Sequence, residues 1–247
     1  MSSLPGNGRS DVGGAKVSAL ITQSNYIPWK GYFDAIDRAD VFVLYDDAQY
    51  TKRDWRNRNR IKTHHGLLWL TIPTLVKGRF LQAVQDTEVA DHDWAELHWR
   101  TLQHEYARAP WFTEYAPLLD VLYKRAAGLD RLSDVNCLFL GAMCDLLYIH
   151  TPMRWSREFT LVGDRNEKLI GMCKDLGVNR YLTGPAARAY LDEDLFRRAG
   201  IEVAWIEYAG YPEYEQLHGP FKHSVSIVDL ILNEGPAAKD YIKTRTT

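Results

Sequence analysis

Cysteine is scarce in this sequence, and the few cysteines present form no recognisable motif. The 247 residues include only Cys137, Cys144 and Cys173, an odd number with no CxxC pair. Thiols spaced in this way within apolar helical patterns are typical of buried, reduced residues and not of disulfides or a zinc site. We therefore predict that none of the three is essential. A catalytic cysteine is the alternative, although no local signature supports it.

The sequence also lacks an excess of positive charge and any long hydrophobic run. Its formal net charge is -2 and its isoelectric point is about 6.4, so it has no overall basic field of the kind that binds nucleic acid. No apolar stretch is long enough to span a membrane. Residues 1–15 are polar and rich in glycine, without an apolar signal region, and predict a disordered tail. We expect a cytoplasmic protein that binds no nucleic acid.

Motifs for metals and nucleotide cofactors are missing as well. There is no HExxH sequence, no Cys/His pair at metal-ligand spacing, no P-loop and no GxGxxG motif. We therefore predict neither a bound metal nor a cofactor.

The chain does contain enough apolar material, 46% of its residues, to bury a sizeable core. It predicts an α/β fold, with a mostly parallel sheet, flanking helices and a helical insertion in the middle of the chain. We expect a single domain over 16–247, with a helical subdomain at about 91–150. The predicted strands lie at 16–22, 41–46, 67–73, 180–184 and 201–208. The predicted helices lie at 29–37, 91–110, 113–126, 133–146, 165–177, 192–200 and 226–235.

The stretch from Gln23 to Pro73 is rich in side chains that can both stack and hydrogen-bond, and basic residues accompany them. An apolar core does not need this chemistry, whereas a pocket for a polar, anionic ligand does. The substrate-binding residues predicted from this stretch are Gln23, Tyr26, Trp29, Tyr32, Gln49, Tyr50, Asn57, Arg58, Arg60 and Lys62.

Arg58, Arg60 and Lys62 alternate along an extended segment, which places their side chains on one face. Guanidinium groups bind phosphate or carboxylate through two parallel hydrogen bonds. We interpret the three residues as a clamp for an anionic substrate group. The alternative is a solvated basic hairpin, because most runs of charge are only that.

Polar residues also follow two of the predicted strands. Asp46 ends one strand and could orient a ligand, act as a general base or bind a metal, but Asp is equally common in turns. Tyr181, Thr183 and Gly184 end another and lead into a Gly-Pro turn. Such a turn can present backbone N–H groups to an anion, or it can be an ordinary tight connection.

One pattern in this chain resembles the opening signature of the WbqC-like family. It runs Gln23-x-x-Tyr26-x-Pro28-Trp29-x-Gly31-Tyr32-Phe33, and VFVLYDDAQY, the segment from Trp55 to Lys62 and WLTIP follow it. The resemblance covers roughly residues 17–236. Its later matching positions are Tyr181, Gly184, Tyr190, Tyr214, Gln216, Phe221, Ser226, Asp229, Asn233 and Gly235.

The resemblance implies a role in bacterial surface-polysaccharide (O-antigen) or specialised-metabolite biosynthesis. It favours an acyl or aminoacyl (amide-forming) transferase that acts on an amino-sugar nucleotide or a carrier-bound amino acid. The expected partners are a small anionic substrate, either a nucleotide sugar or a phosphopantetheine-linked acyl group, and a carrier protein. The alternatives are a glycosyltransferase-type enzyme of O-antigen assembly and a non-catalytic accessory binding protein.

Histidines are the commonest general bases, and two of the eight lie next to matching positions. His218 and His223 flank the Gly-Pro-Phe loop beside Tyr214 and Gln216, which we add to the substrate-binding set. The predicted catalytic residues are Asp46, His218 and His223. A surface or structural role is the alternative for each histidine.

Loops that follow parallel strands share one edge of the sheet. We therefore expect the predicted site residues to converge on one cleft. The rival interpretation is an oligomer interface, where Tyr, Trp and Arg are also enriched. The six side chains that would show convergence are Gln23, Tyr26, Asp46, Arg58, Tyr181 and Gln216.

Overall fold

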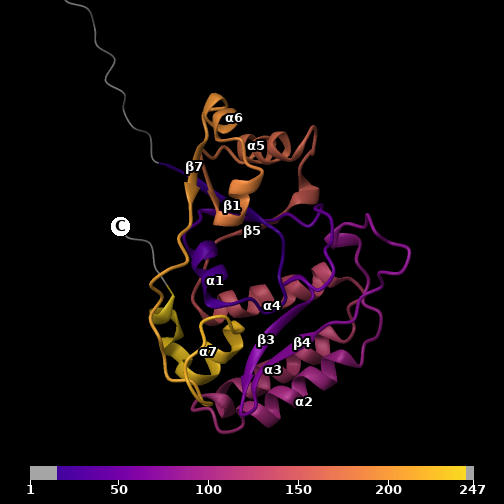
Figure 1. Cartoon of the computed structure of the whole chain (residues 1–247), viewed down its shortest axis with the longest axis vertical. Helices are drawn as coiled ribbons and strands as arrows, with labels where there is room; N and C mark the ends of the chain where they lie inside the picture. The colour runs from indigo at the N-terminus through magenta and orange to yellow at the C-terminus, as the bar shows by residue number, and fades with distance from the viewer. Residues whose placement is uncertain (1–15, 243–247) are drawn as a thin grey trace, which may run out of the picture.

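A five-stranded parallel sheet forms the centre of the computed structural model, which describes residues 16–242 (Figure 1). The spatial order is β5-β2-β1-β6-β7, and every neighbouring pair is parallel. The predicted α/β class is confirmed, whereas the tail expected over 1–15 lies outside the described residues. The strands are β1 (Ser18–Thr22), β2 (Val41–Leu44), β5 (Met153–Trp155), β6 (Arg180–Thr183) and β7 (Glu202–Trp205).

The central strands are continuous apolar runs because both faces of the sheet are covered. Leu20 and Leu182 point into one core, and the alternate residues Ile21 and Tyr181 point into the other. The second core is closed by α5 (Arg165–Asp175) and α6 (Glu193–Arg198). Figure 1 shows these two helices on one side of the sheet, with α1 and α4 on the other.

The connection that follows β1 and the connection that follows β6 leave on opposite faces of the sheet. After β1 the chain enters α1 (Lys30–Asp37), whose Phe33 and Ile36 belong to the first core. After β6 it passes through a short 3-10 helix (Pro185–Ala189) to α6, whose Phe196 belongs to the second core. Adjacent strands with opposed connections leave a crevice at their carboxyl ends. The fold therefore places a crevice between β1 and β6.

The strand predicted at 67–73 lies outside the parallel sheet. It is observed as β4 (Gly66–Thr71), which pairs only with β3 (Arg58–Thr63) in an antiparallel hairpin. The sequence predicted a strand there and an extended segment from Arg58 to Lys62, but it did not assign the two as partners. The short edge strand β5 was not predicted, because three residues are too few for a periodic signal.

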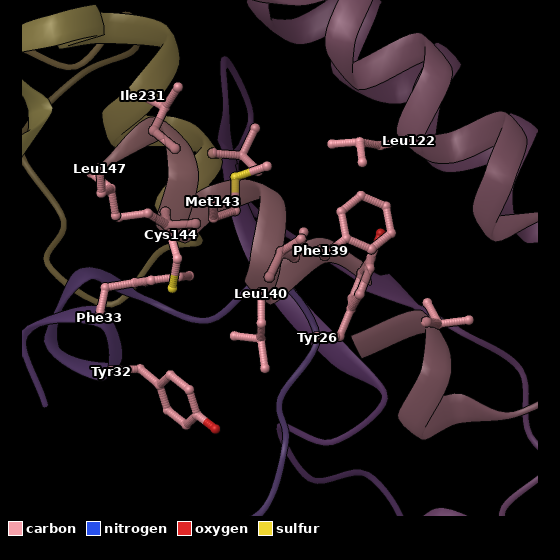
Figure 2. Packing of buried hydrophobic residues seen from close by; sticks show 14 of the residues in the cluster. Tyr26, Tyr32, Phe33, Leu122, Phe139, Leu140, Met143, Cys144, Leu147 and Ile231 are labelled. Atoms are coloured by element: carbon pink, nitrogen blue, oxygen red, sulfur yellow. The ribbon is translucent and has the colours of Figure 1, made fainter. Parts of the chain in front are cut away.

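Four helices besides α1 share the first core with the sheet: α2 (Trp94–Tyr106), α3 (Phe112–Ala126), α4 (Leu132–Leu146) and α7 (Ile227–Glu234). Tyr26 is fully buried here, and its ring meets that of Phe139 edge-on at 5.5 Å. Figure 2 shows Cys144 of α4 next to Phe33 of α1, with Met143 and Leu140 further along α4. None of the helices within residues 16–242 is long and apolar enough to cross a membrane.

Lys30, at the start of α1, connects this helix to the irregular segment 206–225. The residue is only 3% exposed, and its ammonium group donates to the Pro212 carbonyl. The rings of Tyr211, Tyr214 and Phe221 lie 5.1–5.8 Å from Nζ, at cation–π distance. Burial lowers the pKa of Lys30 to about 8, against a smaller opposing effect of Glu213.

This lowered pKa gives a testable pH dependence. Between about pH 8 and the ordinary lysine pKa, the unfolded chain keeps a proton that folded Lys30 has lost, so the free energy of unfolding increases with pH. We expect wild type to gain stability relative to Lys30→Met between pH 7.5 and pH 9.5 in urea unfolding. Tyrosines titrate in both proteins, so the difference isolates Lys30. Equal changes in the two proteins would contradict the assignment.

Candidate functional site

A cleft of about 470 Å³ lies where the fold predicts a crevice, at the carboxyl ends of β1 and β6. Its volume is in the range of pockets that bind small molecules. The strand ends contribute Thr22, Gln23, Thr183 and Gly184 to its wall. The other polar and aromatic residues that line it are Asn25, Trp29, Tyr32, Trp55, Arg56, Tyr190 and Tyr208.

Aromatic side chains form one wall of this cleft. The Trp29 and Tyr208 rings meet edge-on, with centroids 5.5 Å apart. The Tyr32 hydroxyl donates to the Gln23 carbonyl at 2.7 Å and so fixes the strand end. A Cβ at Gly184 would lie 3.1 Å from the Tyr208 hydroxyl, so the close approach of this wall favours glycine. Such rings offer a stacking surface for a planar or sugar group.

Arg56 supplies the positive charge of the cleft. Its guanidinium donates to Asn25 Oδ1, and another nitrogen lies 3.6 Å from the Asp54 carboxylate. Its Nε is buried and has no hydrogen-bond partner within the described chain. An unsatisfied buried N–H carries a free-energy cost, and the Nε atoms of Arg58 and Arg60 share this state.

A smaller cavity of about 220 Å³ adjoins the cleft and shares Asn25, Trp29 and Trp55 with it. Its far side is bounded by Asn59 and Ser224. The Arg60 guanidinium donates to the Ser224 hydroxyl at 2.7 Å, so a second cation lies at that border. The two spaces together suit an elongated ligand.

The turn between Asn25 and Trp29 has a strained backbone, and hydrogen bonds from Asn59 support it. Ile27 has φ +35°, a conformation that is costly for a β-branched residue. The Asn59 amide donates to the carbonyls of Tyr26 and Ile27 at 3.2 and 2.9 Å. Asn59 thus maintains the turn between Asn25 and Trp29.

Asp46 is the centre of a buried polar network beneath the cleft. Its carboxylate accepts the Ser24 backbone N–H at 2.8 Å and the Ser24 hydroxyl at 2.7 Å, together with the Ser133 hydroxyl. Asn136 of α4 donates to Ser24 Oγ and to the Arg56 carbonyl, each at 2.9 Å. The network therefore joins the end of β1, the end of β2, α4 and the segment that carries Arg56.

Burial raises the pKa of the Asp46 carboxyl, while the hydrogen bonds from Ser133 and Ser24 and the charge of Arg56 oppose this effect. Asp46 is fully buried and does not line the cleft. Its geometry is that of a structural acceptor, and the predicted catalytic role finds no contact with the cleft.

Several other predicted site residues are buried in the fold. The Tyr26 hydroxyl bonds Tyr123 and His98, the Tyr50 hydroxyl bonds Thr74, and the Tyr181 ring stacks on Phe196 at 5.3 Å. Asn57 donates to the Ile72 carbonyl, whereas the exposed Gln49 donates to the Phe80 carbonyl. Each of these residues therefore makes a contact within the protein, although the buried Asn57 Oδ1 has no hydrogen-bond partner among the described residues.

The predicted clamp separates into two parts. Arg58 and Arg60 lie on one face, with their guanidinium carbons 4.1 and 5.3 Å from the Trp69 ring. Lys62 instead donates to Gln216 at 2.8 Å, further along the hairpin. The cation–π stacking explains why two arginines occur on this strand without ion pairs to described carboxylates.

The C-terminal candidates lie outside the cleft. The hydroxyl of Tyr214 and the amide of Gln216 donate to the buried Asp229. His218 Nε2 donates to the Glu105 backbone carbonyl at 2.9 Å, and the exposed His223 packs on Phe221. Burial and the charge of Lys30 lower the pKa of His223. The six side chains expected to converge therefore do not, since only Gln23 lines the cleft.

The thiols lie away from the lining residues too. Burial raises the pKa of Cys144 and of Cys173 to about 12, and it also raises that of Cys137. These directions are the opposite of what an activated nucleophile needs. Within residues 16–242, no group of three or more His, Cys, Asp or Glu side chains is arranged to hold a metal ion.

The sequence reasoning missed Arg56, Asn25, Trp55, Tyr190 and Tyr208 as site residues. The first three lie in the stretch that it singled out, and Arg56 has the same spacing of two as Arg58 and Arg60, but the predicted clamp began at Arg58. Tyr190 was noted only as a matching position, and Tyr208 follows a strand that sits next to β6. Tyr208 could not be assigned to the site from the sequence, because the sequence does not give the spatial order of the strands.

Comparison with known proteins identifies the family. The profile of the WbqC-like protein family matches residues 23–241, so the chain belongs to that family. The chain is 46% identical over 223 residues to the uncharacterized protein Rv1507c of Mycobacterium tuberculosis, a match that covers 90% of this chain and 96% of that protein. No solved structure matches the chain.

The buried network predicts a measurable effect of Asp46→Asn. The amide keeps the size of the side chain but brings two N–H groups to a position where three donors already converge. We expect the free energy of unfolding to fall by about 2–4 kcal/mol. Asp145→Asn, at an exposed position on α4, is the matched control and should stay within about 0.5 kcal/mol of wild type. Equal stability of the two variants in urea unfolding would contradict the structural role.

Proposed function

We propose that this WbqC-like protein is a cytoplasmic enzyme that binds an anionic small molecule in the cleft and transfers an acyl or aminoacyl group to an amine. The proposed setting is surface-polysaccharide or specialised-metabolite biosynthesis. The observation that carries the proposal is Arg56, whose guanidinium lines a cleft between aromatic side chains and has a buried Nε without a partner in residues 16–242.

The ligand class follows from the groups around the cleft. A guanidinium recognises phosphate or carboxylate, and aromatic rings such as Trp29 and Trp55 stack on sugars, bases or the pantetheine chain. The adjoining cavity, with Arg60 at its border, provides room for a second part of the ligand. An amino-sugar nucleotide or a phosphopantetheine-linked acyl group, brought by a carrier protein, has both an anionic and a stacking part.

The reaction requires little from the protein beyond positioning. The amine nitrogen attacks the thioester carbonyl, a C–N bond forms, the C–S bond breaks, and the departing thiolate takes up the proton that the amine loses. No His, Cys, Asp or Glu is among the described residues that line the cleft. We therefore assign orientation of the two reactants as the main source of rate acceleration.

The same composition of the cleft supports one other function. A non-catalytic binding protein needs a ligand pocket but no acid or base. The cleft is such a pocket, and its described lining contains no His, Cys, Asp or Glu. The two functions differ in turnover, because only the enzyme releases free thiol from an acyl-pantetheine donor when an amine acceptor is present.

Removal of the Arg56 charge tests the proposed site. One bidentate charge-assisted contact contributes about 1.5–3 kcal/mol, so Arg56→Ala should weaken binding by roughly tenfold or more. Calorimetric titration would use a UDP-linked amino sugar and acetyl-coenzyme A, which carries the pantetheine arm. Arg60→Ala should have a smaller effect, and Arg58→Ala, whose side chain stacks on Trp69, the smallest.

Arg197→Ala is the matched control, because this exposed arginine on α6 pairs only with Asp194 among the described ion pairs. It should bind like wild type, and all four variants should melt within a few degrees of it. Wild-type affinity in Arg56→Ala for every probe that wild type binds would refute the site.

A further inference from the structure

A second cavity, of about 430 Å³, lies at the turn of the β3–β4 hairpin and has no residue in common with the cleft. The loop 217–222 forms its other wall. Four of the residues that line it are basic, none is acidic, and two had been assigned from sequence to a single active site. The four are Lys62, His64, His218 and Lys222.

Lys62 is the innermost of these groups. The residue is only 4% exposed, and its ammonium donates to Gln216 Oε1 at 2.8 Å and to the Gly219 carbonyl at 3.0 Å. Both acceptors are neutral oxygens, and no carboxylate of residues 16–242 lies within ion-pair distance of Nζ. Burial lowers the pKa of Lys62, and the charge of Lys222 lowers it further, although Asp229 opposes both.

Asp229, the carboxylate whose charge acts on Lys62, is already engaged by other groups. Asp229 accepts from the Tyr106 hydroxyl at 2.7 Å, the Tyr214 hydroxyl at 2.7 Å and the Gln216 amide at 2.9 Å. Gln216 thus links Asp229 to Lys62 through two hydrogen bonds, but the neutral amide does not neutralise the ammonium charge. The side chain of Lys62 is held in place on one side and has hydrogen-bonding capacity left on the side of the cavity.

Glu105 orients the two imidazoles. His64 Nδ1 lies 3.2 Å from its carboxylate, and His218 Nε2 lies 2.9 Å from its backbone carbonyl. The two rings are 6.2 Å apart. With one nitrogen of each ring engaged by Glu105, the second nitrogen of each is available for another partner, as in sites where a second shell fixes a histidine.

We propose that this cavity binds a phosphate-type oxyanion, either inorganic phosphate or the end of a phosphate monoester. Two ammonium groups of opposite walls and two oriented imidazoles provide the charge and the hydrogen bonds that such a dianion requires. Leu67 and Leu217 add apolar side chains to the lining. The site is independent of the proposed transferase reaction.

Titration with sodium phosphate tests the proposal, with sodium chloride of equal ionic strength as the reference. We expect one saturable site in wild type. Lys62→Met and Lys222→Met should each weaken it about tenfold or more. Lys222 is exposed, so its variant keeps the fold even if the buried Lys62 does not tolerate replacement. Lys77→Met, at another exposed lysine, should bind like wild type.

Two further measurements locate the anion. In imidazole NMR spectra phosphate should shift His64 and His218 and leave His92 and His150 unchanged. Arg56→Ala should retain phosphate binding, which separates this site from the cleft. The absence of saturable binding in wild type, affinity unchanged in Lys222→Met, or equal shifts of all histidines from general charge screening would each overturn the proposal.

Discussion

A single buried carboxylate determines how the candidate site is built. Asp46 has no exposed surface, and it is tolerated there because two serines and a backbone N–H donate to it. The hydrogen bonds to Asp46, which follows β2, connect it to Ser24 after β1 and to Ser133 in the first turn of α4. Asn136 extends the same network to the carbonyl of Arg56. The position of the cleft's cation therefore depends on a residue that the ligand never touches.

Within residues 16–242, the cleft and the cavity at the hairpin turn are two separate polar regions that have no lining residue in common. The cleft at β1 and β6 combines one guanidinium with Trp29, Trp55 and Tyr208, which suits a ligand that has both an anionic and a stacking part. The cavity at the hairpin turn combines two ammonium groups with imidazoles and offers little stacking surface. Arg58 and Arg60, which stack on Trp69 of the β3–β4 hairpin, line neither space.

Much of the fold could be predicted from the sequence, because strands buried on both faces are continuous apolar runs and the helices have clear ends. Gly235 with φ +57° follows the end of α7, in agreement with the predicted helix at 226–235, and Ser226 accepts the Val228 N–H at its start. The site was harder to predict. A polar side chain such as Tyr26, Asp46 or Gln216 needs a partner, but sequence does not say whether that partner is a ligand or another residue. Each of these three found its partner inside the protein, whereas Arg56 did not find one for its Nε.

The most direct test of the cleft uses the tryptophans as reporters, since the eight indole N–H groups are distributed along the whole chain. Nitrogen–proton NMR spectra would be recorded while the ligand that shows the tightest calorimetric binding is added. Signals would be assigned by single Trp→Phe replacements. We predict that the indole signals of Trp29 and Trp55 shift together and saturate, while those of Trp94 and Trp111 stay in place. Saturable shifts confined to tryptophans outside the cleft, with Trp29 and Trp55 unchanged, would contradict it.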